Sequence, residues 1–241
     1  MSQSNNIIPI YEKIEKMVEY IHGWSPIDQL YSLYLLAFST NQLLGNIVEI
    51  GSWSGRSAIV LGEAAKEIGE TKVFAIDYFP NWEDWNENPD GAYEFKTDIE
   101  GVSYLGHHNQ TVWKEPFEES IIPFYNEHPK LLEHFKENIK NNSLDEIVTP
   151  IKGNSNYFSD YVGKNFKCKF LYIDGEHSYE SVKNDIEVMK KYLVRGGIIC
   201  FDDAFTTYEE VDKAIEELII DSDEFIHCNK LTRKLFVAVK R

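Results

Sequence analysis

The sequence predicts an α/β protein built on a doubly wound, mostly parallel sheet. From residue 46 onward, short apolar runs alternate with segments whose apolar residues recur at helical spacing. Such alternation places helices on both faces of a parallel sheet. Two more strand-like runs, residues 224–228 and 235–239, follow the last helical segment and indicate an antiparallel hairpin. The 241 residues are enough for one domain of this kind.

Residues 1–45 are expected to form a helical cap in front of a main domain of residues 46–241. Ile10, Ile14 and Ile21 recur at helical spacing, and Gly23 ends this first segment. Ser25 and Pro26 then indicate the start of a second helix, because a serine cap followed by proline is typical of helix N-termini. The cap is therefore predicted to contain two helices.

The main domain alternates between strands and helices up to the hairpin. Strands are expected at residues 46–50, 72–77, 147–151, 170–174 and 198–202. Helices are expected at residues 57–68, 131–141, 182–193 and 208–219. Gly196 and Gly197 are expected to end the helix that contains Leu193.

Residues 78–129 interrupt this alternation and show no clear periodicity. A stretch of this length inside a compact domain is usually a lid or a binding loop, so we expect an inserted segment on the substrate side. The aromatic and imidazole side chains of the insert belong to Trp82, Trp85, Trp113, His107 and His108. We expect the tryptophans to form a small core and the histidines to lie in exposed loops.

The composition limits the kinds of partner. Asp and Glu number 40 against 24 Lys and Arg, which gives a formal net charge of −16. A chain this acidic lacks the basic surface that binds nucleic acid or an anionic membrane, so we expect neither partner. The sequence shows no long apolar span and no secretory signal, and its three scattered cysteines favour reduced thiols. The expected location is the cytoplasm.

A glycine-containing turn follows the first predicted strand. Glu49, Gly51 and Gly55 give an acid, a glycine after one residue, and a second glycine after three more. Glycines here let the backbone approach a ligand closely, but the spacing does not match a dinucleotide fingerprint, a phosphate loop or a nucleophile elbow. Asp77 ends the second strand, where a carboxylate can accept the hydroxyls of a ribose. The expected ligand is an adenosine compound without a pyrophosphate.

This pattern resembles the S-adenosylmethionine site of class I methyltransferases. Glu49, Gly51 and Gly55 match the glycine motif of that family, and Asp77 stands at its ribose-binding position. The resemblance covers residues 46–241 and implies a Rossmann-like, seven-stranded sheet that ends in an antiparallel hairpin. The residues that it implies for cofactor binding are Glu49, Gly51, Ser52, Trp53, Gly55, Asp77, Asn154, Ser155 and Asp174.

Three acidic residues are expected to converge at neighbouring strand ends. Asp174 ends the fourth strand, and Asp202 and Asp203 end the fifth, which is its neighbour in this family's sheet. Three facing carboxylates repel one another unless a cation lies between them, and oxygen ligands suit Mg²⁺. The arrangement resembles metal-dependent small-molecule O-methyltransferases of the catechol and the macrocin-like sugar types. It implies that Asp174, Asp202 and Asp203 bind Mg²⁺.

Two residues are candidates for the general base. In the catechol type, the base is a lysine three residues after the strand-four aspartate, a position that His177 holds here as a departure from the pattern. In the sugar type, the suggested base is the acid two residues after that aspartate, which corresponds to Glu176. We favour His177, because an imidazole needs less tuning to accept a proton near neutral pH. Glu176 stays open as the alternative.

The resemblance implies a Mg²⁺-dependent O-methyltransferase that acts on a hydroxyl group of a sugar, a glycosylated natural product or a polyol. Two alternatives remain. One is metal-independent methylation of a small molecule, with the acids in structural roles, and the other is a non-catalytic relative that binds the cofactor and supports a partner protein. An NAD-dependent oxidoreductase is disfavoured by the glycine spacing. The relatives also imply a homo-oligomer.

Overall fold

The computed structural model describes residues 8–89, 91–99, 101–107 and 114–241. The strands of its large sheet are β1 (Asn46–Ile50), β2 (Val73–Asp77), β6 (Val148–Lys152), β7 (Cys168–Ile173), β8 (Leu193–Phe201), β9 (Phe225–Lys230) and β10 (Phe236–Lys240). The seven strands have the order β6–β2–β1–β7–β8–β10–β9. The first five are parallel, and β10 runs antiparallel to β8 and β9. The predicted seven-stranded Rossmann-like sheet with a C-terminal antiparallel hairpin is therefore confirmed.

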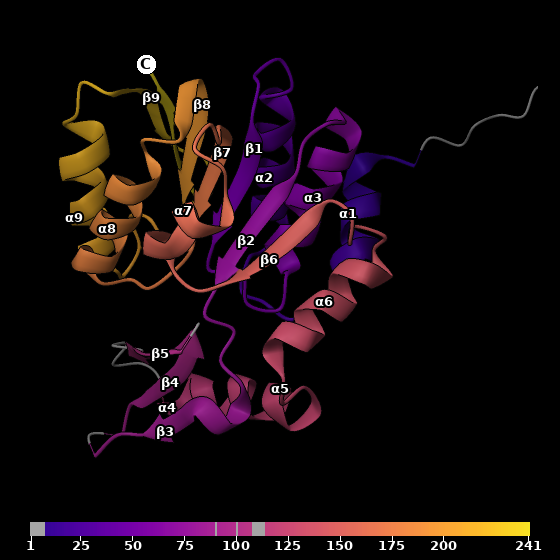
Figure 1. Cartoon of the computed structure of the whole chain (residues 1–241), viewed down its shortest axis with the longest axis vertical. Helices are drawn as coiled ribbons and strands as arrows, with labels where there is room; N and C mark the ends of the chain where they lie inside the picture. Colours follow the sequence, from indigo (N-terminus) through magenta and orange to yellow (C-terminus); the bar gives the residue numbers. More distant parts are fainter. Residues whose placement is uncertain (1–7, 90, 100, 108–113) are drawn as a thin grey trace, which may run out of the picture.

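Helices cover both faces of this sheet (Figure 1). One face carries α1 (Ile10–Val18), α2 (Ile27–Ser39), α3 (Arg56–Ile68) and α6 (Leu131–Asn141). The other carries α7 (Phe158–Tyr161), α8 (Tyr179–Met189) and α9 (Glu209–Ile215), which a π-helical turn, Glu216–Ile220, extends. Apolar residues at helical spacing face the sheet, so each face has its own hydrophobic core.

The N-terminal helices pack into the core of the main domain. Ile14 of α1 and Leu30 of α2 are fully buried in the same cluster as Ile47 of β1. The second helix begins after Pro26, so Ser25 lies just outside it rather than at the cap position that the sequence suggested. The cap therefore stabilises the main domain by covering part of one face of the sheet.

The boundary between α8 and β8 differs from the prediction. Helix α8 ends at Met189, and β8 begins at Leu193, so Gly196 and Gly197 lie within the strand rather than at the helix end. The pairing with β7 shifts between Cys168 and Phe170, and Gly196 has a φ of +78°. A bulge with glycine in the left-handed region accommodates the extra residues in β8.

The insert, residues 78–129, contains regular structure that its sequence did not reveal. Three short strands form a small antiparallel sheet with β4 in the middle: β3 (Trp85–Glu87), β4 (Tyr93–Ile99) and β5 (Val102–His107). The helical turns of the insert are Trp82–Asp84, α4 (Lys114–Pro116), Phe117–Ile121 and α5 (Ile122–Glu127). Figure 1 shows the insert beyond the edge at which β2 and β6 end, which is the ligand side of a parallel sheet.

Trp85 forms the centre of the small core predicted for the insert. Its ring lies 5.0 Å from the rings of both Phe95 and Phe117, and the residue is 8% exposed. Trp82 is exposed instead. Of the other side chains named in the sequence, His108 and Trp113 lie outside the described residues.

The described part of the chain has no helix that is both long and apolar enough to cross a membrane. Cys168 and Cys200 are buried and Cys228 is partly exposed, and all three are free thiols. Buried free cysteines behave as small apolar side chains, and the reduced state of the three thiols stays a prediction.

Candidate active site

The loop between β1 and α3 requires glycine for its backbone and for its packing. Gly51 has a φ of +87°, and a Cβ atom at this position would lie 1.8 Å from the carbonyl oxygen of Asp174. Gly55 has a φ of +95°, and its Cβ atom would lie 3.1 Å from the ring of Phe135. The glycine loop, defined here as residues 51–55, therefore lies directly against the end of β7.

Glu49 is fully buried beneath this loop. Neither of its carboxylate oxygens has a hydrogen-bond partner among the described residues. Burial raises its pKa from the ordinary value of 4.5 to about 7, and the nearby hydroxyls of Ser52 and Ser57 counteract part of this effect. A carboxyl group of this kind can respond to a cationic ligand group that enters the site.

Asp77 holds the loop from the end of β2. Its Oδ2 accepts a hydrogen bond from the backbone N–H of Trp53 at 2.9 Å, and its Oδ1 accepts one from the N–H of Phe79 at 2.6 Å. Burial raises its pKa, and these amides oppose the rise. Each carboxylate oxygen has capacity for a further hydrogen bond, and Asp77 lines the main cavity. Its predicted contact with a ribose stays a prediction.

The turn after β6 places two predicted residues differently. Asn154 lines the cavity, and its side-chain oxygen accepts the backbone N–H of Asn156 at 3.0 Å. Ser155 is fully buried, and its hydroxyl donates to Asp185 at 2.6 Å. The serine hydroxyl therefore faces a neighbouring helix, and Asn156, which the sequence analysis did not single out, lines the cavity instead.

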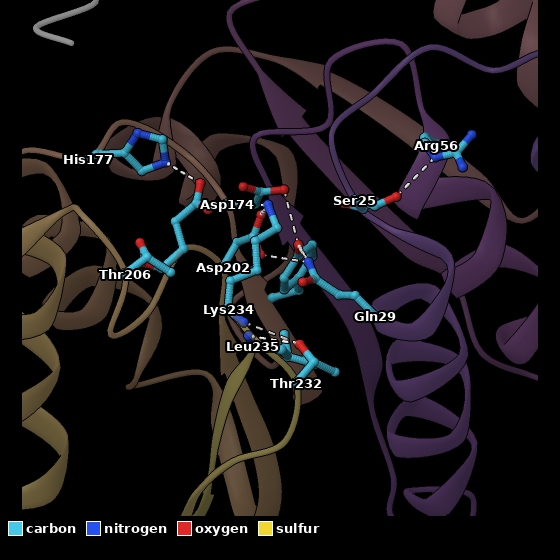
Figure 2. A network of polar contacts seen from close by, with 12 residues as sticks. Ser25, Gln29, Arg56, Asp174, His177, Asp202, Thr206, Thr232, Lys234 and Leu235 are labelled. Carbon is cyan, nitrogen blue, oxygen red and sulfur yellow. Dashed lines mark hydrogen bonds and ion pairs between the residues drawn. The ribbon is translucent and has the colours of Figure 1, made fainter. Parts of the chain in front are cut away.

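The three acids lie close together, and a lysine accompanies them. Figure 2 shows Asp174, Asp202 and Lys234 next to one another. Lys234 Nζ lies 2.7 Å from Oδ2 of Asp202 and 3.2 Å from Oδ1 of Asp203. Burial raises the pKa of Asp174 well above its usual range, and the charge of Asp202 raises it further. The Asp174 carboxyl group therefore favours its protonated form. Lys234 compensates the negative charge of Asp202 and Asp203.

Buried polar groups from the cap and from β7 support this centre. Gln29 of α2 donates its side-chain amide to Oδ1 of Asp202 at 2.6 Å and to the hydroxyl of Tyr172 at 2.9 Å. The Tyr172 hydroxyl in turn donates to Oδ2 of Asp174 at 3.0 Å. Both oxygens of Asp202 are thus engaged, one by an ammonium group and one by an amide.

His177 is held on the other side of the acids. Its Nε2 lies 3.1 Å from Oδ2 of Asp203, and its ring stacks on Tyr208 with a centroid separation of 4.1 Å. Burial disfavours the charged form of Asp203, but the hydrogen bond with His177 and the charge of Lys234 outweigh burial and lower its pKa. An ionised carboxylate beside an imidazole orients the ring and stabilises its protonated form.

Glu176 lies at the cavity wall with its carboxylate already engaged. Its Oε2 accepts the hydroxyl of Ser181 at 2.6 Å. This local contact turns the carboxylate toward the start of α8. Both His177 and Glu176 line the cavity, and the preference for His177 as the base stays a prediction.

The residues close enough to share one metal ion differ from the three predicted Mg²⁺ ligands, and the binding of Mg²⁺ by those three acids stays a prediction. Asp174, His177 and Asp203 each offer one ligand atom, and these three atoms lie within 4.8 Å of one another. One of them is an imidazole nitrogen, whereas Mg²⁺ prefers oxygen ligands. Asp202, the third predicted oxygen ligand, is bound to Lys234 and Gln29 instead. The cation that the sequence analysis required between the carboxylates is supplied, at least in part, by the chain itself.

One cavity of 1130 Å³ connects the glycine loop with this centre. The cap closes one side, because the Arg56 guanidinium donates to the carbonyl oxygens of Val18 at 2.6 Å and Ser25 at 3.1 Å. Residues of the insert close another side, among them Trp85 and Phe95. The volume is large enough for a cofactor and a small substrate together.

Several residues of this site were not identified from the sequence. Lys234 lies more than thirty residues after Asp203, the nearest predicted site residue, and Gln29 lies in the cap. Only the tertiary fold brings the two side chains to Asp202. Tyr172 offered a local signal, since a tyrosine two residues before Asp174 in a strand points to the same face. Tyr208 follows Asp203 closely, but its stacking on His177 depends on the turn between them.

The fold and the site together define a class I methyltransferase. A family model described as a methyltransferase domain matches residues 48–204, more than half of the chain. The chain therefore belongs to the methyltransferase domain family.

Solved structures support the same fold. The O-methyltransferase NovP is 18% identical with a TM-score of 0.59, covering 89% of this chain and 80% of that chain. The calicheamicin methyltransferase CalS11 is 16% identical with a TM-score of 0.59, covering 98% and 87%. An O-methyltransferase from Bacillus cereus in complex with SAH is 16% identical with a TM-score of 0.57, covering 98% and 94%.

Among curated proteins, the uncharacterized protein R132 of Acanthamoeba polyphaga mimivirus is 33% identical over 88 residues. The match spans 35% of this chain and 35% of that relative.

Replacement of Glu49 by glutamine is expected to change how stability depends on pH. Because the pKa of Glu49 is raised to about 7, the folded state keeps a proton that the unfolded chain loses above pH 4.5. Stability therefore falls as pH rises through this window, and Glu49→Gln removes that fall. Between about pH 4 and pH 8, the free energy of unfolding should shift in favour of the variant by about 3 kcal/mol, measured by urea denaturation.

Glu146→Gln removes an exposed carboxylate as the control and should follow the wild type at each pH. Parallel curves for Glu49→Gln and the wild type would show that Glu49 is ionised throughout.

Proposed function

We propose that this methyltransferase uses S-adenosylmethionine to methylate a hydroxyl group of a small molecule. The observation that carries the proposal is the single cavity that joins the glycine loop to His177 and Asp203. A methyl donor at the loop and an acceptor beside the imidazole would share that space. Membership of the methyltransferase domain family supports the methyl transfer, and the imidazole and carboxylate support a hydroxyl acceptor, which must lose a proton.

The cofactor is proposed to occupy the end of the cavity formed by β1, β2 and β6. Gly51, Ser52 and Trp53 line that end of the cavity. Asp77 would accept hydrogen bonds from the ribose hydroxyls, and Asn154 would lie near the adenine ring. In the adjacent β7 turn, Asp174 would complete this wall.

Two further residues would act from beneath the cofactor. Glu49 is buried without a hydrogen-bond partner among the described residues, which suits a nearby ammonium group. Ser155 would act through Asp185, which lines the cavity and whose carboxylate accepts a hydrogen bond from the Ser155 hydroxyl. Gly55 would shape the loop rather than contact a ligand, because it faces Phe135.

The residues of the chain can carry out the proton transfer. When bound, S-adenosylmethionine supplies a methyl group attached to a positively charged sulfur. The glycine loop and Asp77 would hold that cofactor, and His177 would accept the proton that the substrate hydroxyl must lose. Asp203, 3.1 Å from Nε2, stabilises the imidazolium that results. The cavity would hold the two reactants close to each other.

Dependence on Mg²⁺ stays a prediction of the sequence analysis. The position of Lys234 favours the metal-independent alternative, because Asp202 and Asp203 already face a cation. No step above requires a metal ion.

The proposed substrate is a sugar, a glycosylated natural product or a polyol. The cavity combines carboxylates with the aromatic rings of Trp24, Trp53 and Tyr208, a combination that suits a ring with several hydroxyl groups. CalS11, described as a TDP-rhamnose 3'-O-methyltransferase in calicheamicin biosynthesis, shares the fold over 98% of this chain. Its sugar substrate makes nucleotide sugars a suitable first group of acceptors.

A screen of acceptors tests the function. Purified protein would be incubated with S-adenosylmethionine and with nucleotide sugars, glycosides, polyols or catechols, each with EDTA and with Mg²⁺. Release of S-adenosylhomocysteine together with a methyl ether product, identified by mass spectrometry, is the expected result. Methylation at nitrogen or carbon only would contradict the proposal. Tight cofactor binding without turnover of any acceptor would favour the non-catalytic alternative.

A further inference from the structure

The acidic centre contains a lysine that the family motif does not account for. Lys234 lies in the turn between β9 and β10, and its side chain is 17% exposed. Its ammonium group lies within hydrogen-bond distance of Asp202 at 2.7 Å (Figure 2) and of Asp203 at 3.2 Å. A lysine is rarely this buried unless its charge is paired.

The backbone fixes the lysine in place. The N–H of Ala204, next to Asp203, donates to the carbonyl oxygen of Lys234 at 2.9 Å. In the same turn, the Thr232 hydroxyl oxygen accepts the N–H of Leu235 at 3.1 Å. These contacts tie the β9–β10 turn to the end of β8, so the ammonium group reaches the carboxylates from a rigid support.

A divalent ion and this ammonium group would compete for the same carboxylates. An ion bound by Asp174, His177 and Asp203 would share Asp203 with Lys234, and two cations at one carboxylate repel each other. Asp202 could join such an ion only by giving up its bonds to Lys234 and Gln29. The geometry therefore makes metal binding and the lysine contact mutually opposed.

We propose that Lys234 is the resident cation of this centre and takes the place of a divalent metal ion. The lysine holds Asp203 in the position from which that carboxylate orients His177, so Lys234 is a positioning residue for the proposed O-methylation. The inference rests on the proposed function for its role in the reaction. The exclusion of metal by the lysine can be measured separately.

Lys234→Met tests the inference, because it keeps the length of the side chain and removes the charge. The probe is Mn²⁺ alone, whose free fraction is read from its electron paramagnetic resonance signal. Wild-type protein is expected to leave millimolar Mn²⁺ free, and Lys234→Met is expected to bind Mn²⁺ at least tenfold more tightly. Lys234→Arg, which restores a cation, should return Mn²⁺ binding to the wild-type level.

Lys240→Met serves as the charge-matched control, since Lys240 contacts the backbone carbonyl of Lys190 rather than the acids. It should leave Mn²⁺ binding unchanged. If Lys234→Met does not fold, the double variant Lys234→Met with Asp202→Asn restores the local charge balance. That double variant should bind Mn²⁺ more tightly than the wild type.

The wild-type measurement alone can overturn the inference. Micromolar binding of Mn²⁺ to the wild type, displaced by Mg²⁺, would show that the lysine does not replace the metal. Equal Mn²⁺ affinities in the wild type, Lys234→Met and the double variant would have the same meaning. Activity with a known acceptor should survive EDTA in the wild type, fall at least tenfold in Lys234→Met, and recover in Lys234→Arg.

Titration of S-adenosylhomocysteine on the same samples separates the two proposals. Cofactor binding together with tight Mn²⁺ binding by the wild type would contradict only the role of Lys234. Failure to bind the cofactor would contradict the proposed function and leave the metal measurement interpretable.

Discussion

His177→Ala is expected to reduce kcat by a factor of about 10²–10⁴, the usual effect of removing a general base. The imidazole lies 3.1 Å from Asp203 and stacks on Tyr208, so its position is supported from two sides. The affinity for S-adenosylhomocysteine should change little, because the glycine loop is unaltered. Initial rates with an acceptor from the screen, together with calorimetry, measure the two quantities.

Glu176→Gln is the comparison that decides between the two candidate bases. Its carboxylate accepts the Ser181 hydroxyl, a contact that glutamine can also accept through its amide oxygen, so most of the activity should remain. Loss of activity in Glu176→Gln combined with retained activity in His177→Ala would assign the base to Glu176. Full activity in both variants would remove base catalysis by either residue from the mechanism.

Gly51→Ala is expected to prevent cofactor binding and to lower the free energy of unfolding by more than about 4 kcal/mol. The added methyl group would lie 1.8 Å from the carbonyl oxygen of Asp174, and backbone cannot move aside as a flexible side chain can. Its φ of +87° adds strain. Denaturant unfolding gives the stability, and calorimetry with S-adenosylhomocysteine gives the binding.

Gly69→Ala is the control for backbone strain without a clash. Gly69 has a φ of +74°, and a Cβ atom there would have no neighbour within 4 Å. Its cost should therefore be limited to about 1–2 kcal/mol, with cofactor binding unchanged. Similar losses in the two variants would mean that the glycine loop does not pack against β7 as the structure shows.

The sheet could be predicted because each of its strands carries a local signal. Buried parallel strands such as β1 and β7 consist mostly of apolar residues, and α6 begins and ends at the predicted residues. Leu193 was misplaced because an apolar residue four positions after Met189 continues a helical stripe, whereas the bulge at Gly196 depends on pairing with β7. The sheet of the insert was missed because its strands pair only within the insert and mix polar with apolar residues.

Only the residues that directly follow the parallel strands could be placed in the site from the sequence. Asp174, Asp202 and Asp203 follow adjacent parallel strands, so the topology brings them together. The identity of the cation among them depends on a turn of the C-terminal hairpin, which a motif at strand ends does not include. The direction of the Ser155 hydroxyl likewise depends on Asp185, which lies on a helix thirty residues further along the chain.

The central claim of the proposal is that the glycine loop and Asp77 form an S-adenosylmethionine site. Calorimetric titration of S-adenosylhomocysteine into the wild-type protein, once with EDTA and once with Mg²⁺, tests it most directly. The account predicts one site per chain with a micromolar Kd that is the same in both conditions. Absence of binding in both conditions, or binding that requires Mg²⁺, would contradict it.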